Sequence, residues 1–324
     1  MILAGDIGGT KTALAFFAQG APRQPLSEKT FLSQNFSSLE SIVREFLAGR
    51  TERIASASFG VAGVVLDDKA KVTNLNWIVD ANSLSQTIAA PVYLLNDLEA
   101  IARAVPHLNE KDLETLNVGE SQLRAPIAVI APGTGLGEAF LVWDGARYRA
   151  HASEGGHADF APTNEIELEL LKYLLPRLGH VSYERVCSGR GLPNLYAFLK
   201  DSGRLVEPDW LRDKLLPASD ATPIIIEYAT ENKAEICAAS LELFISILGA
   251  EAGNLALKFL ATSGVYLGGG IPPRIVTQLK AKNFFQSFTR KGRFSELLAR
   301  IPIHIIVNHH AALFGAAWRA TENE

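Results

Sequence analysis

The residues with the clearest chemical potential lie near the start of the chain, where Asp6 precedes a turn of Gly8, Gly9 and Thr10. One apolar run ends at Asp6 and another follows the turn, which predicts a strand, a tight turn and a second strand. Adjacent glycines have no Cβ atoms, so a polyanion could be held there by main-chain N–H groups, with Asp6 holding a metal ion. Taken alone, the stretch fits an ordinary glycine hairpin equally well.

The same local design recurs in the second half of the chain. An apolar run at 127–132 breaks at Gly133–Gly137 and resumes, and a third glycine turn, Gly268–Gly270, ends the apolar run 264–267. None of these turns matches a P-loop, and the first leads into a strand rather than into the helix of a dinucleotide-binding motif. Two halves built alike therefore predict one ligand held in a cleft between two related domains.

Strands and helices in alternation must position these turns, so we expect an α/β fold. A boundary is expected at 106–125, where prolines and polar residues gather, giving a small domain of 1–107 plus 300–324 and a large domain of 108–299. The further predicted elements are strands at 54–59, 92–95 and 301–307, an edge strand within 19–37, and helices at 39–48, 98–105, 164–178, 230–260 and 311–320.

Some details of these helices are also predicted. Ser37 or Ser38 should cap the first helix, and Asn164 should cap the helix that follows it. The latter helix is expected to bury one face, made of Leu168, Leu171, Leu175 and Leu178. Another helix is expected to begin at 182–185, and 201–222 is expected to be a polar connector.

Composition narrows the class of protein. The chain has 324 residues, 48% of them hydrophobic and 20% charged, which is typical of a globular protein of two domains. The net charge of −4, without a dense basic stripe, argues against nucleic acid as the main partner. Cys187 and Cys237 form neither a disulfide framework nor a zinc set, which favours a reducing cytoplasm.

Membrane association is not expected either. The first residues lack the charged region, apolar core and cleavage site of a signal peptide. The longest apolar stretch, 236–267, is interrupted by Glu242, Glu251 and Lys258 and contains two glycines. It therefore predicts a buried helix rather than a membrane span.

The turns and the motifs between them resemble a known superfamily. The three glycine turns are similar to the two phosphate elements and the adenosine element of the superfamily of sugar kinases, heat-shock ATPases and actin. The segments 95–97, 154–162 and 182–191 narrow the resemblance to bacterial ATP-dependent glucokinases, along nearly the whole chain. The resemblance implies two related ribonuclease-H-like domains around a central cleft, a cytoplasmic location and a homodimer.

The resemblance also implies a role for each matched residue. The sugar would be bound by Asn96, Asp97, Glu154, His157 and Glu184, and Asp97 would accept the proton of the attacking 6-hydroxyl of glucose. This fits the chemistry, because each sugar hydroxyl both donates and accepts a hydrogen bond, and a site built to pair them rejects a sugar lacking one. Phosphoryl transfer needs positioning and charge neutralisation more than covalent help.

ATP and Mg²⁺ would be the cofactors. By the same resemblance, Asp6 would lie near Mg²⁺. The residues that would contact ATP are Gly8, Gly9, Thr10, Lys11, Gly133, Thr134, Gly135 and Gly137 at the phosphates, and Gly268, Gly269 and Gly270 at the adenosine.

Each polar residue also has a purely structural interpretation. Asp97 could be only the N-cap of its helix, Glu184 a favourable charge in a first helical turn, and Asp6 a turn cap. Glu154 and His157 could be ordinary loop residues. The joint pattern favours the site, whereas no single residue does.

Two residues depart from the expected pattern. Glucokinases of this group usually have Asn at the position of Lys11, whereas Lys is common there in the wider repressor-and-sugar-kinase family. Lys11 could add a cation near the phosphates or point away from them. The zinc motif of that wider family is missing, since 158–191 contains only Cys187, so no structural zinc is expected. Glu138 is an unusual charge in a predicted strand and receives no role.

Two other functions remain open from the sequence. One is a kinase for another hexose, such as fructose, mannose or an N-acetylated amino sugar, because the residues around the 2-position of the sugar are not placed. The other is a sugar-sensing protein without catalysis, against which the intact Asp97 counts. Regulation and the use of ADP or polyphosphate as donor are not decided by the sequence.

Overall fold

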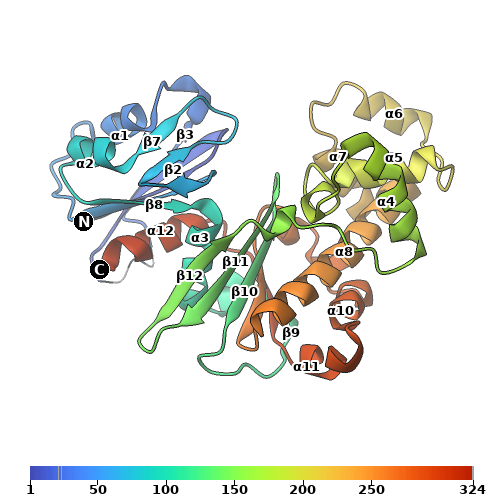
Figure 1. The fold of residues 1–324 in the computed structure, drawn as a ribbon. Helices are drawn as coiled ribbons and strands as arrows, with labels where there is room; N and C mark the ends of the chain where they lie inside the picture. Colours follow the sequence, from blue (N-terminus) through green and yellow to red (C-terminus); the bar gives the residue numbers. More distant parts are fainter. Residues whose placement is uncertain (21, 23, 323–324) are drawn as a thin grey trace. The chain divides into compact units, whose positions relative to one another are not determined.

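The computed structural model of the chain describes residues 1–20, 22 and 24–322 (Figure 1). The chain divides into two compact units, each an assembly of strands and helices. Unit 1 comprises Met1–Lys111, Asp144–Ala152 and Asn308–Glu324, and unit 2 comprises Asp112–Trp143 and Ser153–Val307. The α/β class expected from the sequence is therefore confirmed.

Unit 1 is built on a sheet whose strand order is β3-β2-β1-β4-β8. Its strands are β1 (Ile2–Ile7), β2 (Lys11–Phe17), β3 (Ser27–Leu32), β4 (Ser56–Val61) and β8 (Val92–Asn96). Strand β2 pairs antiparallel with both β1 and β3. Strands β1, β4 and β8 are parallel, with Ile7 beside Val61 and Val61 beside Asn96. The carboxyl ends of the parallel strands therefore meet at one edge, which is where ligands bind in such sheets.

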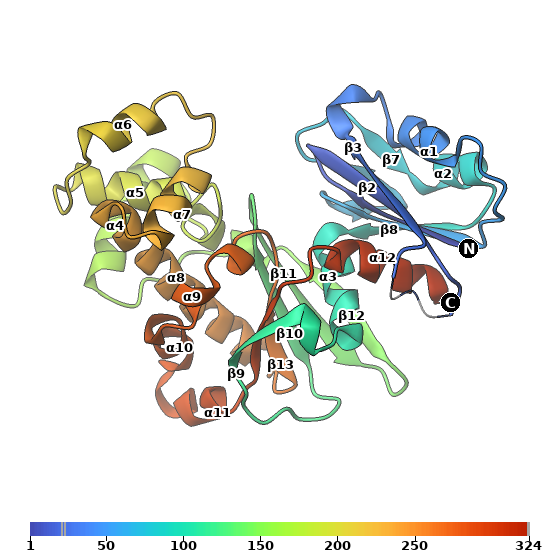
Figure 2. The same ribbon diagram turned by 180° about the vertical axis from the view of Figure 1, so that it is seen from behind.

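Helices cover both faces of this sheet (Figures 1 and 2). On one face, Leu3 and Phe16 pack with Ile42 of α1, and on the other, Ile2 and Ala4 pack with the C-terminal helix α12. Alternate residues of a strand point to opposite faces, which explains this division. The helices are α1 (Leu39–Leu47), α2 (Ala81–Ile88), α3 (Asp97–Ala104) and α12 (Ala311–Thr321), and a small sheet adds β5 (Val65–Leu66), β6 (Lys69–Lys71) and β7 (Ile78–Asp80).

The second sheet has the strand order β12-β11-β10-β13-β14-β9. Its strands are β9 (Leu113–Asn117), β10 (Ile127–Pro132), β11 (Leu136–Trp143), β12 (Tyr148–Ser153), β13 (Gly264–Leu267) and β14 (Ile303–Ile306). As in unit 1, a hairpin (β10 and β11) precedes two further strands, β13 and β14, that run parallel to its first strand. The two sheets therefore share one design, as their similar glycine turns predicted.

The helices of unit 2 include the long helix α8, which α5, α7, α9 and α10 contact (Figure 2). They are α4 (Glu165–Leu178), α5 (Leu192–Asp201), α6 (Asp209–Leu215), α7 (Thr222–Thr230), α8 (Glu235–Phe259), α9 (Val276–Leu279), α10 (Lys282–Thr289) and α11 (Ser295–Ala299). Single 3-10 turns occur in both units: η1 (Ser33–Asn35), η2 (Val105–His107), η3 (Glu110–Asp112), η4 (Gly155–His157), η5 (Tyr183–Arg185), η6 (Pro272–Arg274) and η7 (Gly292–Phe294).

Helix α8 is the core of unit 2. By length and composition it is, among the described residues, the one helix that could cross a membrane, but 78% of its most apolar window is buried inside the protein. Gly249 and Gly253 lie against the carbonyl oxygens of Phe284 and Phe288 in α10, where any Cβ would overlap. The two glycines therefore let α8 and α10 pack backbone to backbone, as expected of a core helix.

The structure corrects three details of the sequence prediction. Helix α4 buries Leu170 and Leu174, whereas Leu168 and Leu175 are about half exposed. Leucines surround this helix, so periodicity alone did not identify the face that packs against α5 and α8. The helix expected at 182–185 is a single 3-10 turn, and the expected connector 201–222 contains helix α6.

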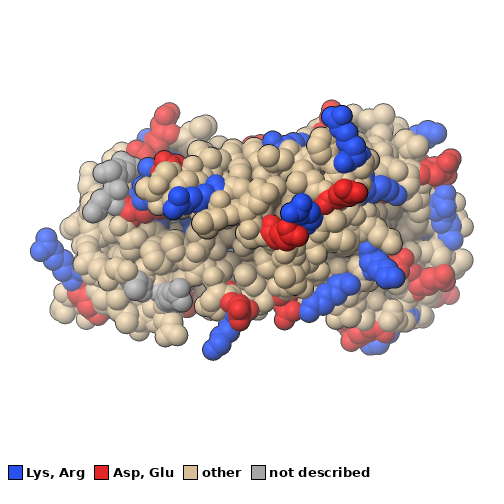
Figure 3. All heavy atoms as spheres, turned by 90° about the horizontal axis from the view of Figure 1, so that it is seen from below, with Lys and Arg blue, Asp and Glu red and all other residues tan. Residues whose placement is uncertain are grey.

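Charged side chains are mixed on the surface. On the face shown in Figure 3, Lys and Arg side chains of the described residues are interspersed with Asp and Glu side chains. Such mixing gives no large field of one sign on that face.

Candidate active site

The turn between β1 and β2 is held in a defined shape. Gly8 N–H donates to the carbonyl of Lys11 (2.9 Å), and the Ser33 hydroxyl donates to the carbonyl of Gly8 (2.8 Å). A Cβ at position 9 would lie 2.6 Å from the carbonyl oxygen of Thr73, so only glycine fits there. The exposed Lys11 begins β2. The backbone of this turn is therefore preorganised and closely approached by its neighbours.

Asp6 and Asp97 form a pair of carboxylates at the ligand-binding edge of the first sheet. Asp6 lies near the end of β1, and Asp97 is the first residue of α3, which follows β8. Burial and the nearby charge of Asp97 raise the pKa of Asp6 to about 6. Because two like charges in a partly buried place disfavour each other, a bound cation would relieve the repulsion.

Asn96, not Asp97, is the N-cap of helix α3. Its side-chain oxygen accepts from Leu98 N–H (2.9 Å), and its amide nitrogen donates to the carbonyl of Gly63 (3.0 Å). Leu98 N–H also donates to Asp97 Oδ1 (2.9 Å), so Asp97 shares this hydrogen bond although the N-cap residue is Asn96. Capping by Asn96 leaves Asp97 in the first helical turn, where the helix macrodipole favours a negative charge.

The two glycine turns of unit 2 lie side by side. Gly133 N–H donates to the carbonyl of Gly135 (2.9 Å), and Gly189 N–H donates to the carbonyl of Gly133 (2.8 Å). Gly269 has a positive φ of 80°, and a Cβ there would lie 2.6 Å from the carbonyl oxygen of Pro132, directly before the first turn. The turns at 133–137 and 268–270 therefore adjoin at the ends of β10 and β13.

Glu184 lies against the first of these turns. Its Oε2 accepts from Leu136 N–H (3.1 Å), and a Cβ at Gly135 would overlap this oxygen. The segment that carries Glu184 is anchored by its own chain, since Ser188 Oγ donates to the Glu184 carbonyl (2.7 Å). Glu184 thus has a specific place beside the glycine turn, rather than only a favourable position in a helix.

Glu154 and His157 flank the same strand end. They stand on the η4 turn, with His157 Nε2 3.9 Å from Glu154 Oε2, and more than half of each side chain is exposed. The turn is seated on β11, because a Cβ at Gly156 would overlap the carbonyl oxygen of Leu136. Within unit 2, the η4 turn and the segment that carries Glu184 therefore both contact Leu136, and the side chains of Glu154 and His157 are exposed.

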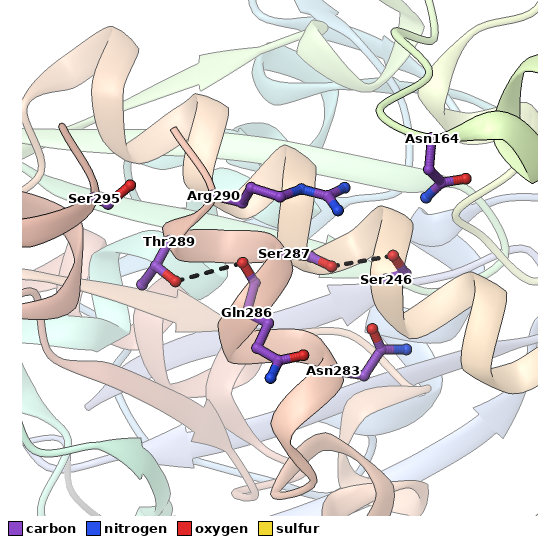
Figure 4. A pocket seen from close by; sticks show the side chains of 8 residues that line it. All are labelled: Asn164, Ser246, Asn283, Gln286, Ser287, Thr289, Arg290 and Ser295. Carbon is purple, nitrogen blue, oxygen red and sulfur yellow. Dashed lines mark hydrogen bonds between the residues drawn. The ribbon is translucent and has the colours of Figure 1, made fainter. Parts of the chain in front are cut away.

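A cavity elsewhere in unit 2 has a different character (Figure 4). It measures about 470 Å³ and is lined by Asn164, Ser246, Asn283, Gln286, Ser287, Thr289, Arg290 and Ser295. Ser246 Oγ lies 3.0 Å from Ser287 Oγ across its wall. None of the site residues expected from the sequence lines it, and its lining includes no carboxylate or imidazole, so we place the chemistry at the glycine turns instead.

Sequence reasoning missed two residues that shape the site. Ser33 holds the first turn, but a single serine in a polar loop carries no distinguishing signal. Glu251 of α8, which the sequence showed only as an interruption of an apolar stretch, is fully buried. A carboxylate surrounded by small and apolar residues along a core helix is a signal that could have revealed it.

Comparisons with known proteins agree along the whole chain. A model of the glucokinase family matches residues 3–323. The glucokinase of Nostoc sp. strain PCC 7120 is 41% identical over 334 residues, with 98% of each chain covered. The crystal structure of a glucokinase from an Antarctic psychrotroph has a TM-score of 0.85 at 30% identity, again covering 98% of each chain.

A fourth comparison shows the fold alone. The ROK family glucokinase from Streptomyces griseus, solved in complex with glucose and AMPPNP, has a TM-score of 0.66 at 20% identity and covers 99% of each chain. These neighbours have the fold of the actin-like ATPase and sugar kinase class, which the sequence predicted for this chain.

Proposed function

The chain belongs to the glucokinase family, and from this membership we propose that it transfers the γ-phosphoryl group of ATP to the 6-hydroxyl of D-glucose. The products are ADP and D-glucose 6-phosphate. The observation that carries the proposal is the full-length family match in a chain that keeps Asp97 and the cluster of Glu154, His157 and Glu184.

Asp97 is the general base in this proposal. It accepts the proton of the 6-hydroxyl as that oxygen attacks the γ-phosphorus, and it needs only to lie within hydrogen-bond reach of that proton. The first turn of α3 supports its ionised form through the helix macrodipole. Asn96 supports this role by fixing the start of α3, and one N–H of its amide is not used by Gly63 and can reach a sugar hydroxyl.

The remaining sugar contacts come from Glu154, His157 and Glu184. The two carboxylates accept from sugar hydroxyls, and the imidazole can donate or accept according to its tautomer. Exposure of Glu154 and His157 supports a role in ligand binding, because neither side chain is consumed by a buried partner. A site of this kind rejects sugars that lack a paired hydroxyl.

ATP is assigned to the glycine turns. The backbone around Gly8–Thr10 and Gly133–Gly137 would surround the phosphates, Lys11 would add positive charge, and Gly268–Gly270 would lie against the adenosine. The adjacency of the last two turns in unit 2 supports this assignment, since one nucleotide would contact both. Main-chain N–H groups in such turns suit anions.

The residues present fit Mg²⁺ at Asp6. Burial and, after it, repulsion by Asp97 raise the pKa of Asp6, and a bound cation would relieve the repulsion. Mg²⁺ in proteins is commonly held by one or two carboxylates together with phosphate oxygens, which Asp6 and ATP would supply. When bound, the ion neutralises charge on the transferring phosphate.

Location and assembly are part of the proposal through the family resemblance. We place the enzyme in the cytoplasm, and its two buried thiols, Cys187 and Cys237, are unpaired. We also propose a homodimer assembled through the large domain. A monomer mass in sedimentation equilibrium would refute the dimer.

A coupled assay of ADP release with a panel of hexoses tests the function. Glucose is expected to be turned over in preference to fructose, mannose and N-acetylglucosamine. Preferred turnover of another hexose would replace glucose as the substrate. Glucose binding without turnover of any hexose would instead favour a sugar sensor.

A further inference from the structure

Glu138 is a buried carboxyl that the proposed chemistry does not use. It stands in β11, directly after the glycine turn, and only 1% of its surface is exposed. Its Oε1 atom is buried and has no hydrogen-bond partner among the described residues. Burying such a group is costly, so its presence calls for a physical reason.

The other carboxyl oxygen of Glu138 supports the η4 turn. Oε2 lies against Gly155, where any Cβ would overlap it. Gly155 N–H donates to Ser153 Oγ (3.0 Å), and the next residue, Gly156, rests on the carbonyl of Leu136. Strand β11 therefore holds this turn at two points, and the turn carries Glu154 and His157.

A buried polar network continues from Glu138 on its other side. Glu251 of α8 is the charged neighbour of Glu138, and its carboxylate accepts from Asn254 Nδ2 (2.8 Å) and Lys258 Nζ (3.2 Å). Asn254 Nδ2 in turn donates to the Tyr183 hydroxyl (3.0 Å), and Tyr183 directly precedes Glu184. The network thus joins the two segments that carry Glu154, His157 and Glu184.

We propose that Glu138 is a positioning residue of the sugar site, which through its contacts with Gly155 and Glu251 sets the affinity for the sugar and not the affinity for ATP. The inference rests on the proposed function. Two neighbouring buried carboxyl groups repel each other when both are charged, so one of them holds a proton. Since Glu251 is paired with Lys258 and Asn254, Glu138 is the partner that holds it.

The charges around Glu138 support this protonation. Burial and the charge of Glu251 raise the pKa of Glu138 to about 7, against the opposing effect of Lys258. Tyr183 of η5 and Cys187, which follows η5, are further titratable groups that face Glu138 and Glu251. Lys291, which follows α10, is another, and its Nζ donates to Asn254 Oδ1 (2.5 Å).

Loss of the proton has a consequence for the sugar site. Above about pH 7 two adjacent buried carboxylates repel each other. The repulsion displaces the carboxyl from Gly155, so the Michaelis constant for glucose should rise with pH. The Michaelis constant for ATP should not follow this rise, since the contacts of the two carboxyls described above are with Gly155, Asn254 and Lys258.

Steady-state kinetics of three variants test the inference. Glu138→Ala is expected to raise KM for glucose about tenfold, while kcat and KM for ATP stay within about twofold. Glu138→Gln keeps the shape and an N–H donor for Glu251, so its KM for glucose should equal that of the wild type near neutral pH and lack the alkaline rise. Leu141→Ala, at another buried position of β11, controls for general damage to the strand and should leave KM for glucose unchanged.

Several results would overturn the role of Glu138. An unchanged KM for glucose in folded Glu138→Ala would do so, as would an equal rise in KM for ATP or an equal effect of Leu141→Ala. If Glu138→Ala fails to fold, the Glu138→Gln variant still decides the question. An alkaline rise in its KM for glucose equal to that of the wild type would also overturn the role of Glu138. A wild type that turns over no hexose would refute the proposed function instead, and calorimetric titration with glucose would then test Glu138 through the dissociation constant.

Discussion

Replacing Glu138 by glutamine should stabilise the protein relative to the wild type, and this gain in the free energy of unfolding should be larger at alkaline pH than at acid pH. Glu138 is 1% exposed, and its pKa is raised from 4.5 to about 7. Between these two values the native state binds more protons than the unfolded state, so the free energy of unfolding of the wild type falls as pH rises. Glutamine does not titrate, and the variant lacks this loss.

The size of the effect follows from the two pKa values. A difference of about 2.5 units corresponds to about 3 kcal/mol in full, of which about 2.5 kcal/mol is lost between about pH 5 and pH 8. The burial of the group means that solvent screening does not reduce this value much. Near pH 5, where the carboxyl is neutral, we expect the two proteins to agree within about 1 kcal/mol.

Equilibrium unfolding in urea, near pH 5 and near pH 8, measures the effect. Glu242→Gln, at an exposed position of the same helix α8 that carries Glu251, serves as the control and should show no pH-dependent difference. A stability difference between wild type and Glu138→Gln that is the same at both pH values would refute the protonation of Glu138, and with it the electrostatic argument.

Three further predictions concern catalysis and nucleotide binding. Asp97→Asn should lower kcat at least about 100-fold while glucose binding, measured by calorimetry, changes only a few-fold, and retained turnover would remove Asp97 as the base. Gly9→Ala places a Cβ 2.6 Å from the Thr73 carbonyl oxygen and should raise KM for ATP about tenfold with little change for glucose, whereas an unchanged KM for ATP would separate this turn from the nucleotide. Chelation with EDTA should abolish ADP release until Mg²⁺ is added back, and activity that survives chelation would contradict a metal at Asp6.

Local features were predictable because they depend on neighbours in the sequence. Ser38 caps α1 and Asn164 caps α4, each accepting a hydrogen bond from a backbone N–H three residues later. The strand-turn-strand pattern around Gly8 and Gly133 is also local, since apolar alternation and glycine determine it over a few residues. These elements have the type that was predicted, with ends shifted by one to two residues.

Non-local packing produced the differences. The leucines of α4 allowed several buried faces, and the contacts with neighbouring helices selected Leu170 and Leu174. The 3-10 turn at 183–185 replaces a helix because Gly189 and Arg190 hydrogen-bond to the turn at Gly133 and Thr134. Such choices depend on chain segments dozens of residues away, which periodicity does not include.

The sequence by itself determined the family of this protein and the motifs that carry its proposed site. Glycine turns and polar residues at strand ends are properties of short segments. Only the tertiary structure decided that Asp6 lies near Asp97, because the parallel pairing of β1, β4 and β8 joins their ends. It likewise turned Glu138, an unexplained charge in a strand, into the buried neighbour of Gly155 and Glu251, since a carboxyl acquires its environment from the elements packed around it.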